Sequence, residues 1–191
     1  HGIHRGGLKA GEYCAIIGAG PIGLLAGMIA QAYGAHAILL DLVQERLDFA
    51  KELGIEYVIN SGEEDAAARV SEITGGMMAQ QVMECSGSNA AIRSSLDLVS
   101  NAGRITLTGW PPRETSIPTD IITRKEIDIR GARTSAGEFE EAIELIYTKK
   151  VDVAKILTKT ISLDEAPETI RDIEKNPGNY MKVVVKVDKT V

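Results

Sequence analysis

The sequence predicts an α/β fold with a doubly wound, six-stranded parallel sheet, and three observations support this prediction. A glycine-rich turn, Gly18-Ala19-Gly20-Pro21-Ile22-Gly23, follows one apolar run and opens a helical pattern. A second apolar run ends on Asp41, eighteen residues beyond the last glycine. Apolar runs and helical patterns then alternate along the chain, as expected when helices cross between parallel strands.

The expected elements follow one another in the order that this fold requires. The expected strands are residues 13–17, 37–40, 57–59, 80–85, 103–108 and 126–130. The expected helices between them are residues 21–33, 44–53, 61–74 and 89–98, the third opened by a capping-box pattern at Ser61 and Glu64. Six strands suit the order 3-2-1-4-5-6, which places a ligand crevice where the strand order reverses.

The pattern changes past the sixth strand. Ser135 and Glu138 form a capping pattern for a helix that ends near residue 147. A strand at 155–161, a helix capped by Ser162-Leu163-Asp164-Glu165 and a β-branched strand at 181–187 follow. These last elements have no place in the six-stranded sheet, so we expect a separate strand–helix–strand segment.

The glycine turn has the residue types that hold the pyrophosphate of a dinucleotide. Gly18 permits a sharp turn, Gly20 lets a phosphate approach the backbone, and Gly23 permits close packing of helix on strand. Pro21 suits the first helical turn, whose free amide hydrogens attract phosphate. The alternative is a tight turn without a ligand.

Asp41 predicts a preference for NAD over NADP. Its carboxylate can accept hydrogen bonds from the adenosine ribose and would repel a 2′-phosphate. Arg46, five residues on, is expected to stack on the adenine, to reach a phosphate or to lie on a solvated helix face. Asp41 is also a candidate N-cap with Gln44 at the third helical position, a role compatible with ribose binding.

Composition and charge exclude several classes of protein. The chain has 191 residues, a net charge of −6 and no basic surface that indicates nucleic-acid binding. Its longest apolar segment, about a dozen residues, is too short to span a bilayer, and no signal peptide is recognised. Cys14 and Cys85 are expected to be buried, reduced thiols in apolar strands. We therefore expect a cytoplasmic protein.

Five patterns, the first of which contains the glycine turn and Asp41, occur in a consistent order over nearly all of the chain. They are residues 18–41, 84–87, 103–109, 125–131, and 162–168 with 182–186. Together they resemble the medium-chain zinc-dependent alcohol dehydrogenase family. The similarity is closest to the branch of sorbitol (polyol), threonine and butanediol dehydrogenases. It implies a Rossmann fold, NAD as the cofactor, and hydride transfer from the carbon of a secondary alcohol or polyol.

The resemblance also assigns cofactor-binding residues. It implies that the pyrophosphate lies against the glycine turn, at Gly18, Gly20, Pro21, Ile22 and Gly23. It implies that the adenosine ribose and adenine contact Asp41 and Arg46, at and beyond the end of the second strand. It implies that three later segments line the adenine and nicotinamide halves: Cys85-Ser86-Gly87, Thr108-Gly109 and Ala132-Arg133. Polyol dehydrogenases usually place an aromatic residue and then an arginine just after the sixth strand, whereas a gap-free match puts Arg133 and Thr134 there. Arg133 is then either a pyrophosphate contact or a surface residue.

Zinc is implied only for the parent protein. The chain has two cysteines in strands and three histidines, His1, His4 and His36, without the spacing of a zinc site. We expect no catalytic residue and no metal ligand among them. The interpretation is a linker at 1–8 from a missing N-terminal catalytic domain, an NAD-binding Rossmann domain at 9–150, and a segment at 151–191 that returns to the catalytic domain. Such a fragment is expected to be inactive alone.

Two other interpretations stay open. Activity within the chain would use Ser86, Tyr33 or Tyr147, although no YxxxK or GxSxG pattern supports it. The second is a non-catalytic NAD-binding or oligomerisation module.

A sheet edge favours the second of these. Ile127, Ile129 and the loop at 110–112 lie at or near the sixth strand, and an exposed edge invites pairing between two copies. The expected partners are therefore a small-molecule alcohol or polyol in the parent protein and a second copy of the chain, with neither nucleic acid nor membrane.

Overall fold

The computed structural model describes residues 1–187 and divides the chain into two compact units, residues 1–151 and residues 152 onward. The first unit contains a six-stranded sheet in the order β3-β2-β1-β4-β5-β6, and every neighbouring pair is parallel. Its strands are β1 (Tyr13–Ile17), β2 (His36–Asp41), β3 (Tyr57–Asn60), β4 (Ala79–Glu84), β5 (Val99–Leu107) and β6 (Asp128–Gly131). This order confirms the predicted doubly wound sheet, whose strand order reverses between β1 and β4.

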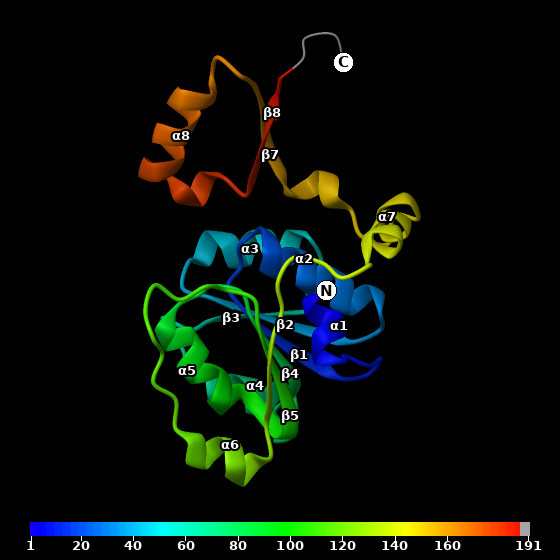
Figure 1. The fold of residues 1–191 in the computed structure, drawn as a ribbon, viewed down its shortest axis with the longest axis vertical. Helices are drawn as coiled ribbons and strands as arrows, with labels where there is room; N and C mark the ends of the chain where they lie inside the picture. The colour runs from blue at the N-terminus through cyan, green and yellow to red at the C-terminus, as the bar shows by residue number, and fades with distance from the viewer. Residues whose placement is uncertain (188–191) are drawn as a thin grey trace. The chain divides into compact units, whose positions relative to one another are not determined.

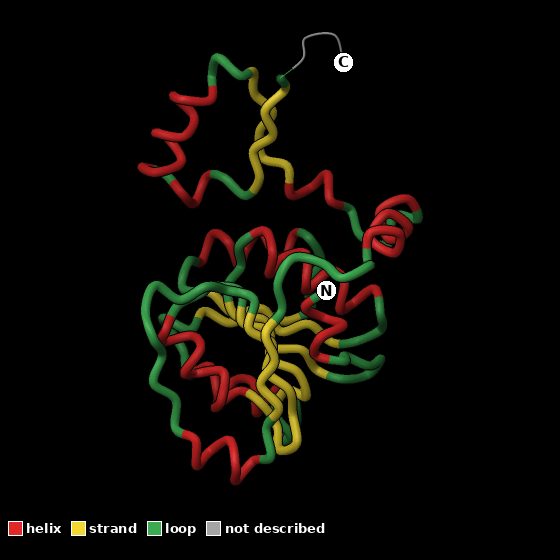
Figure 2. The backbone as a smooth tube through the Cα atoms, viewed as in Figure 1, coloured by secondary structure: helices red, strands yellow, loops and turns green. Residues whose placement is uncertain are grey.

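Helices cover both faces of the sheet (Figures 1 and 2). The helices α1, α2 and α3 lie on one face, and α4, α5 and α6 lie on the other (Figure 1). The helices of this unit are α1 (Gly2–Gly6), α2 (Pro21–Ala32), α3 (Gln44–Glu52), α4 (Ala66–Ile73), α5 (Asn89–Leu98), α6 (Thr119–Lys125) and α7 (Phe139–Tyr147). Central strands covered on both sides read as continuous apolar runs, and Ile16 and Leu39 accordingly have no exposed surface. None of the described helices is long and apolar enough to cross a bilayer.

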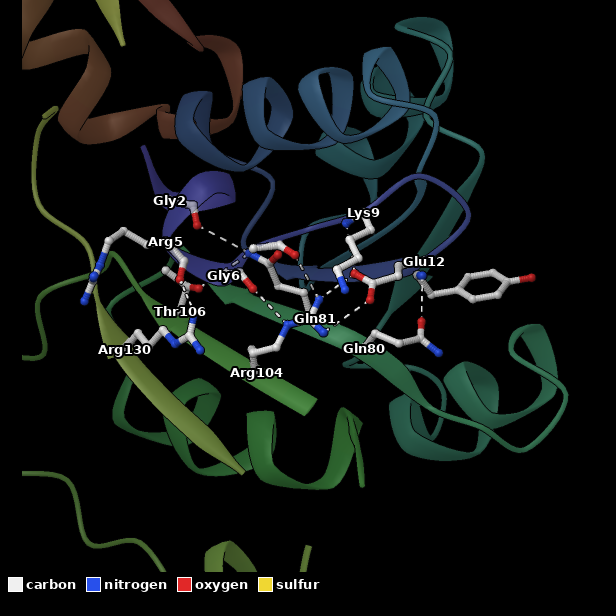
Figure 3. A network of polar contacts seen from close by, with 12 residues as sticks. Gly2, Arg5, Gly6, Lys9, Glu12, Gln80, Gln81, Arg104, Thr106 and Arg130 are labelled. Atoms are coloured by element: carbon white, nitrogen blue, oxygen red, sulfur yellow. Dashed lines mark hydrogen bonds and ion pairs between the residues drawn. The ribbon is translucent and has the colours of Figure 1, made fainter. Parts of the chain in front are cut away.

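The N-terminal residues dock on the sheet through α1, where the sequence suggested a linker. Gln81 Nε2 donates to the carbonyl of Gly2 at 3.3 Å, and Arg104 Nε donates to the carbonyl of Gly6 at 2.8 Å (Figure 3). A Cβ atom at Gly6 would lie 2.0 Å from Gln81 Nε2, so the helix approaches β4 more closely than a side chain would allow. The helix is therefore an integral layer over β4 and β5.

The helix α4 begins later than predicted. Its N-cap is Asp65, whose Oδ1 accepts hydrogen bonds from the amides of Ala67 and Ala68 at 3.0 and 3.1 Å. The predicted capping box that starts at Ser61 is wrong, because residues 61–64 form a turn after β3. An acid directly before the helix satisfies two free amides and so fixes the helix start.

Several strands differ from their expected bounds, most of all β5, and the helices α1 and α6 were not predicted. β5 begins at Val99 rather than near 103, with an irregular register against β4 and a positive φ of 51° at Ala102. A local bulge of this kind places turn-like residues inside a strand, so the sequence pattern does not indicate where the strand begins. The short helix α6 follows a proline-rich loop, and β6 begins at Asp128 rather than 126.

The β6 edge is less apolar than the sequence suggested. Ile127 is 7% exposed and belongs to the core, whereas Ile129 is 37% exposed. The prediction that both side chains form an interface is therefore wrong for Ile127.

The second unit confirms the expected strand–helix–strand segment. Its parallel strands β7 (Leu157–Ser162) and β8 (Lys182–Lys186) flank α8 (Ala166–Lys175) in the sequence. Two 3₁₀ turns, η1 (Val153–Ile156) and η2 (Pro177–Asn179), complete it. The predicted cap of α8 at Ser162 is wrong, because Ser162 ends β7 and the N-cap of α8 is Glu165. The Ser162 hydroxyl nevertheless donates to Glu165 Oε2 at 2.7 Å.

Candidate functional site

The glycine turn between β1 and α2 leaves open space at its centre. Gly18 has a φ of 107°, and a Cβ atom there would lie 3.1 Å from the amide nitrogen of Ser86. At Gly23 a Cβ would lie only 1.8 Å from the carbonyl oxygen of Gly18. At Gly20, by contrast, a Cβ would meet no atom within 4 Å. Packing therefore explains the outer two glycines, and Gly20 presents bare backbone to free space.

The N-terminus of α2 opens at this same point. The helix starts at Pro21 with Gly20 as its N-cap, and no side chain caps it. The first amides of a twelve-residue helix carry the positive end of its dipole and attract an anion. The next residue, Ile22, is 57% exposed. This geometry suits a phosphate group lying against the turn.

The carboxylate of Asp41 joins the end of β2 to the glycine turn. Its Oδ2 accepts a hydrogen bond from the amide of Ala19 at 2.6 Å, and its Oδ1 accepts from Leu42 and Val43 at 2.8 and 2.9 Å. The side chain is only 10% exposed. These contacts place a negative charge beside the turn and hold it there.

The N-cap interpretation of Asp41 is wrong. Val43 is the N-cap of α3, and Gln44 is the first residue of the helix rather than its third. Arg46 Nη1 lies 3.9 Å from Asp41 Oδ2, so the guanidinium stands beside the carboxylate. Its Nε is buried and has no hydrogen-bond partner among the described residues. The sequence allowed three roles for Arg46, one of them a fully solvated position on the helix face. This role does not agree with the structure, because the side chain is only 27% exposed.

Glu84, the last residue of β4, is a buried acid that the sequence analysis did not assign to the site. Its side chain is fully buried, and Oε1 accepts hydrogen bonds from the amides of Ser86 and Gly87 at 2.8 and 3.0 Å. Oε1 also accepts the Ser86 hydroxyl at 2.5 Å. The signal was available, because an acid at the end of a buried strand requires hydrogen-bond partners. Glu84 thus shapes the turn after β4.

The loops after β4 and β5 contact each other through their backbones. A Cβ atom at Gly109 would lie 2.2 Å from the amide nitrogen of Gly87, and a Cβ at Gly87 would lie 2.8 Å from the carbonyl oxygen of Trp110. The Thr108 hydroxyl donates to the carbonyl of Glu84 at 2.5 Å. The structure thus brings the predicted segments 85–87 and 108–109 together.

Cys85 lies one residue beyond β4 rather than inside it, and it is half-buried. Burial raises the pKa of its thiol to about 12, although a hydrogen bond from Thr108 opposes the increase. A thiol with such a pKa is protonated and unreactive at neutral pH. Cys14 is also free and is buried.

A groove of about 330 Å³ lies at the carboxyl ends of β4, β5 and β6. Four of the predicted residues line it, namely Ile22, Thr108, Ala132 and Arg133. The guanidinium of Arg133 lies 5.0 Å from the centroid of the Trp110 ring, in a cation–π contact. Trp110, which the sequence placed at the mouth of the crevice just after the fifth strand, also lines it. The lining residues that the sequence did not predict come mainly from α1 and α2: His1, Gly2, Ile3, Leu25, Ala26, Ile29, Met83 and Thr134.

The described residues offer no metal centre. No group of three or more His, Cys, Asp or Glu side chains within residues 1–187 is placed to hold an ion. Two of the histidines contact single carboxylates instead, His1 with Glu138 at 2.7 Å and His36 with Glu56 at 2.9 Å. This donor set does not fit zinc.

A larger hollow, of about 620 Å³, lies within the second unit. It is lined by charged side chains such as Lys159, Arg171 and Asp172, and by none of the predicted site residues. It is therefore not the candidate site.

A doubly wound parallel sheet with an open glycine turn after β1 and an acid at the end of β2 defines a protein with a Rossmann-type fold. Residues 21–148 match the family model of the zinc-binding dehydrogenases, and the chain belongs to this family. The match confirms the resemblance to the medium-chain zinc-dependent alcohol dehydrogenases.

Individual relatives agree with this assignment. An uncharacterized zinc-type alcohol dehydrogenase-like protein of Haemophilus influenzae is 50% identical over 96% of this chain and 54% of its own length. The sorbitol dehydrogenase of Gallus gallus is 31% identical over all of this chain and 54% of its own length. The chain therefore spans about half the length of these curated relatives. A solved structure of a zinc-binding dehydrogenase from Sinorhizobium meliloti 1021, bound to NADP, has a TM-score of 0.88 at 27% identity and covers 98% of this chain and 56% of its own.

Proposed function

We propose that this chain is the NAD-binding portion of a zinc-dependent medium-chain dehydrogenase that oxidises a secondary alcohol or polyol by hydride transfer to NAD. The observation that carries the proposal is the open backbone at Gly20, flanked by an uncapped helix N-terminus and the Asp41 carboxylate. The names of the curated relatives, which include sorbitol dehydrogenase, support the class of substrate.

The adenosine half of the cofactor would be held by the β1–β3 side of the sheet. The helix N-terminus of α2 attracts the pyrophosphate, and bare backbone at Gly20 lets it approach. Asp41 retains acceptor capacity for the ribose hydroxyls while it binds Ala19. Its negative charge next to the ribose disfavours the 2′-phosphate of NADP, so the proposal is NAD specificity, although one relative of similar fold binds NADP.

The nicotinamide half would occupy the groove at the ends of β4, β5 and β6. Bound NAD supplies the hydride acceptor, and the protein orients its ring. Thr108 and Ala132 offer polar backbone and side-chain groups at the groove wall, while Ile22 covers it with apolar surface. Arg133 stands at the same wall, stacked on Trp110, and can reach an anionic group.

We further propose that the zinc ligands and most of the alcohol pocket belong to a catalytic domain that precedes His1. In this proposal the segment at 151–191 returns to that domain, and the isolated chain binds NAD without turnover. The absence of a fitting donor set among the described residues motivates the proposal. Sequencing the parent gene upstream of His1 tests it: an upstream region without cysteine, histidine and carboxylate ligands at zinc spacing would refute it.

We also propose that copies associate through the edge strand β6. Ile129 is part-exposed on this strand, and edge strands readily pair across a two-fold axis. Sedimentation of the protein and of an Ile129→Lys variant tests this proposal. A monomeric wild-type protein at micromolar concentration would refute it.

Parallel titrations with NAD⁺ and NADP⁺ test the cofactor assignment. Calorimetry measures affinity directly, and quenching of Trp110, the single tryptophan, reports binding at the groove. We expect NAD⁺ to bind at least about tenfold more tightly than NADP⁺, equivalent to about 1.4 kcal/mol. If neither dinucleotide binds, the proposal is wrong.

A matched pair of glycine variants locates the site. Gly20→Ala adds a methyl group to open space, so it should fold normally and weaken NAD⁺ binding by blocking the pyrophosphate. Gly178→Ala in the second unit also meets open space and should leave binding unchanged. Equal affinities of the two variants would place the pyrophosphate elsewhere.

A further inference from the structure

Glu84 carries a buried negative charge without a positive partner. All of its hydrogen bonds are ones that it accepts, from the Ser86 amide and hydroxyl and from the Gly87 amide, as an ionised carboxylate does. No Lys, Arg or His side chain of the described residues forms an ion pair with it. A charge buried in this way acts over several ångströms with little screening.

The carboxylate lies against the backbone of one segment of the groove wall. Its Oε2 would be 2.7 Å from a Cβ atom at Gly109, which lies between Thr108 and Trp110, two residues of the groove wall.

This position corresponds to the nicotinamide half of a bound dinucleotide. A doubly wound sheet binds one mononucleotide on each side of the switch point, and Asp41 on β2 assigns the adenosine to the β1–β3 side. β4 is the first strand of the other half, and Glu84 is its last residue. A nicotinamide ring in the groove would therefore lie near an unpaired negative charge, with the backbone of Gly109 between them.

We propose that Glu84 makes the site discriminate between the two redox states of the cofactor, favouring the cationic ring of NAD⁺ over the neutral ring of NADH. The inference rests on the proposed function, because it requires the dinucleotide to occupy this crevice. Glu84 is neither a base nor a nucleophile in this role. Its charge stabilises the oxidised cofactor and thereby favours oxidation of the alcohol.

The ratio of two dissociation constants isolates this effect. Both redox states carry the same pyrophosphate, so repulsion between Glu84 and the phosphates cancels in the ratio for NAD⁺ and NADH. Only the interaction with the ring charge remains. A unit charge at the distance of a neighbouring residue, in a partly buried site, is expected to change the ratio by about five- to tenfold.

The first test replaces Glu84 with glutamine. In Glu84→Gln the amide oxygen can keep the bonds from Ser86 and Gly87 that Oε1 now accepts, while the charge is lost. Calorimetric titration with NAD⁺ and NADH should show that NAD⁺ loses about five- to tenfold in affinity relative to NADH. Asp128→Asn is the matched control, because it removes an equal charge from the opposite, amino end of β6 and should leave the ratio unchanged.

A second pair of variants covers the case in which Glu84→Gln does not fold. Ser86 is exposed, so Ser86→Lys can place a cation beside the carboxylate, and Ser86→Met supplies a neutral side chain of similar length. The lysine variant should shift the ratio toward NADH relative to the methionine variant. If all of these variants bind both cofactors and their ratios of the NAD⁺ and NADH dissociation constants agree within about twofold, the inference about Glu84 is wrong. The proposed function would not be affected by that result. If the wild-type protein binds neither cofactor, both this inference and the proposed function are wrong.

Discussion

Arg104 on β5 forms a bidentate ion pair with Glu12: Nη1 lies 3.2 Å from Oε1, and Nη2 donates to Oε2 (Figure 3). The two side chains are only 16% and 18% exposed. The same guanidinium donates through Nε to the carbonyl of Gly6. One side chain therefore ties α1, the loop before β1 and β5 together.

Breaking this pair should destabilise the fold. Arg104→Met leaves a largely buried carboxylate and a backbone carbonyl without partners, so we expect the free energy of unfolding to fall by about 2–3 kcal/mol. Asp97→Asn, which breaks an ion pair whose side chains are 42% and 51% exposed, should cost less than about 0.5 kcal/mol. Urea unfolding of the two variants measures the difference, and equal losses would contradict the structure.

The same pair predicts how stability depends on pH. Burial opposes ionisation of Glu12, but hydrogen bonds from Arg104 and Lys9 outweigh it, and the pKa of Glu12 in the folded protein is lowered. A lowered pKa stabilises the fold above the unfolded value of about 4.5, and this stabilisation is lost as the pH falls through the folded pKa. The stability difference between the wild-type protein and Glu12→Gln should therefore shrink toward acid. A difference that is constant from pH 7 to about pH 3 would refute this linkage.

The cap of α4 offers a direct comparison between sequence pattern and structure. Asp65→Ala removes the acceptor for two amides and should cost about 1 kcal/mol of stability. Ser61→Ala removes the residue that the sequence pattern favoured as the cap, and it should cost much less. Thermal unfolding monitored by circular dichroism distinguishes the two positions. A larger effect at Ser61 would restore the original capping box.

The last two glycines of the turn, Gly20 and Gly23, should tolerate a methyl group very differently. At Gly23 the added Cβ would lie 1.8 Å from Gly18 O, so Gly23→Ala should lower stability by about 3 kcal/mol or prevent folding. Gly20→Ala meets open space and should unfold at nearly the wild-type temperature. Differential scanning calorimetry of both variants provides the measurement. A stable Gly23→Ala protein would mean that α2 packs less closely on β1 than described.

The parts of the molecule that the sequence predicted well depend on local patterns. The glycine turn, the acid at Asp41 and the apolar run of β1 are readable because each is encoded by neighbouring residues. The same holds for the alternation of strands and helices that defines the doubly wound sheet.

The parts that were missed depend on contacts between distant residues. The docking of α1 rests on Gln81 and Arg104, which lie more than 70 residues away in the sequence. The sequence indicates that Glu84 needs hydrogen-bond partners, but only the structure identifies them as Ser86 and Gly87 in the turn after β4. Start and end positions also shifted where a bulge at Ala102 disturbed the regular pattern.

The backbone contact between Gly87 and Gly109 limits how this crevice can diversify. Because neither position has room for a Cβ atom, the backbones of the turns after β4 and β5 are held against one another. Changes in the shape and charge of the crevice would then have to come from exposed side chains such as Trp110 and Arg133, which line the groove. A library of variants that randomises those two side chains would change the shape and charge of the crevice and leave the backbone contact between Gly87 and Gly109 intact.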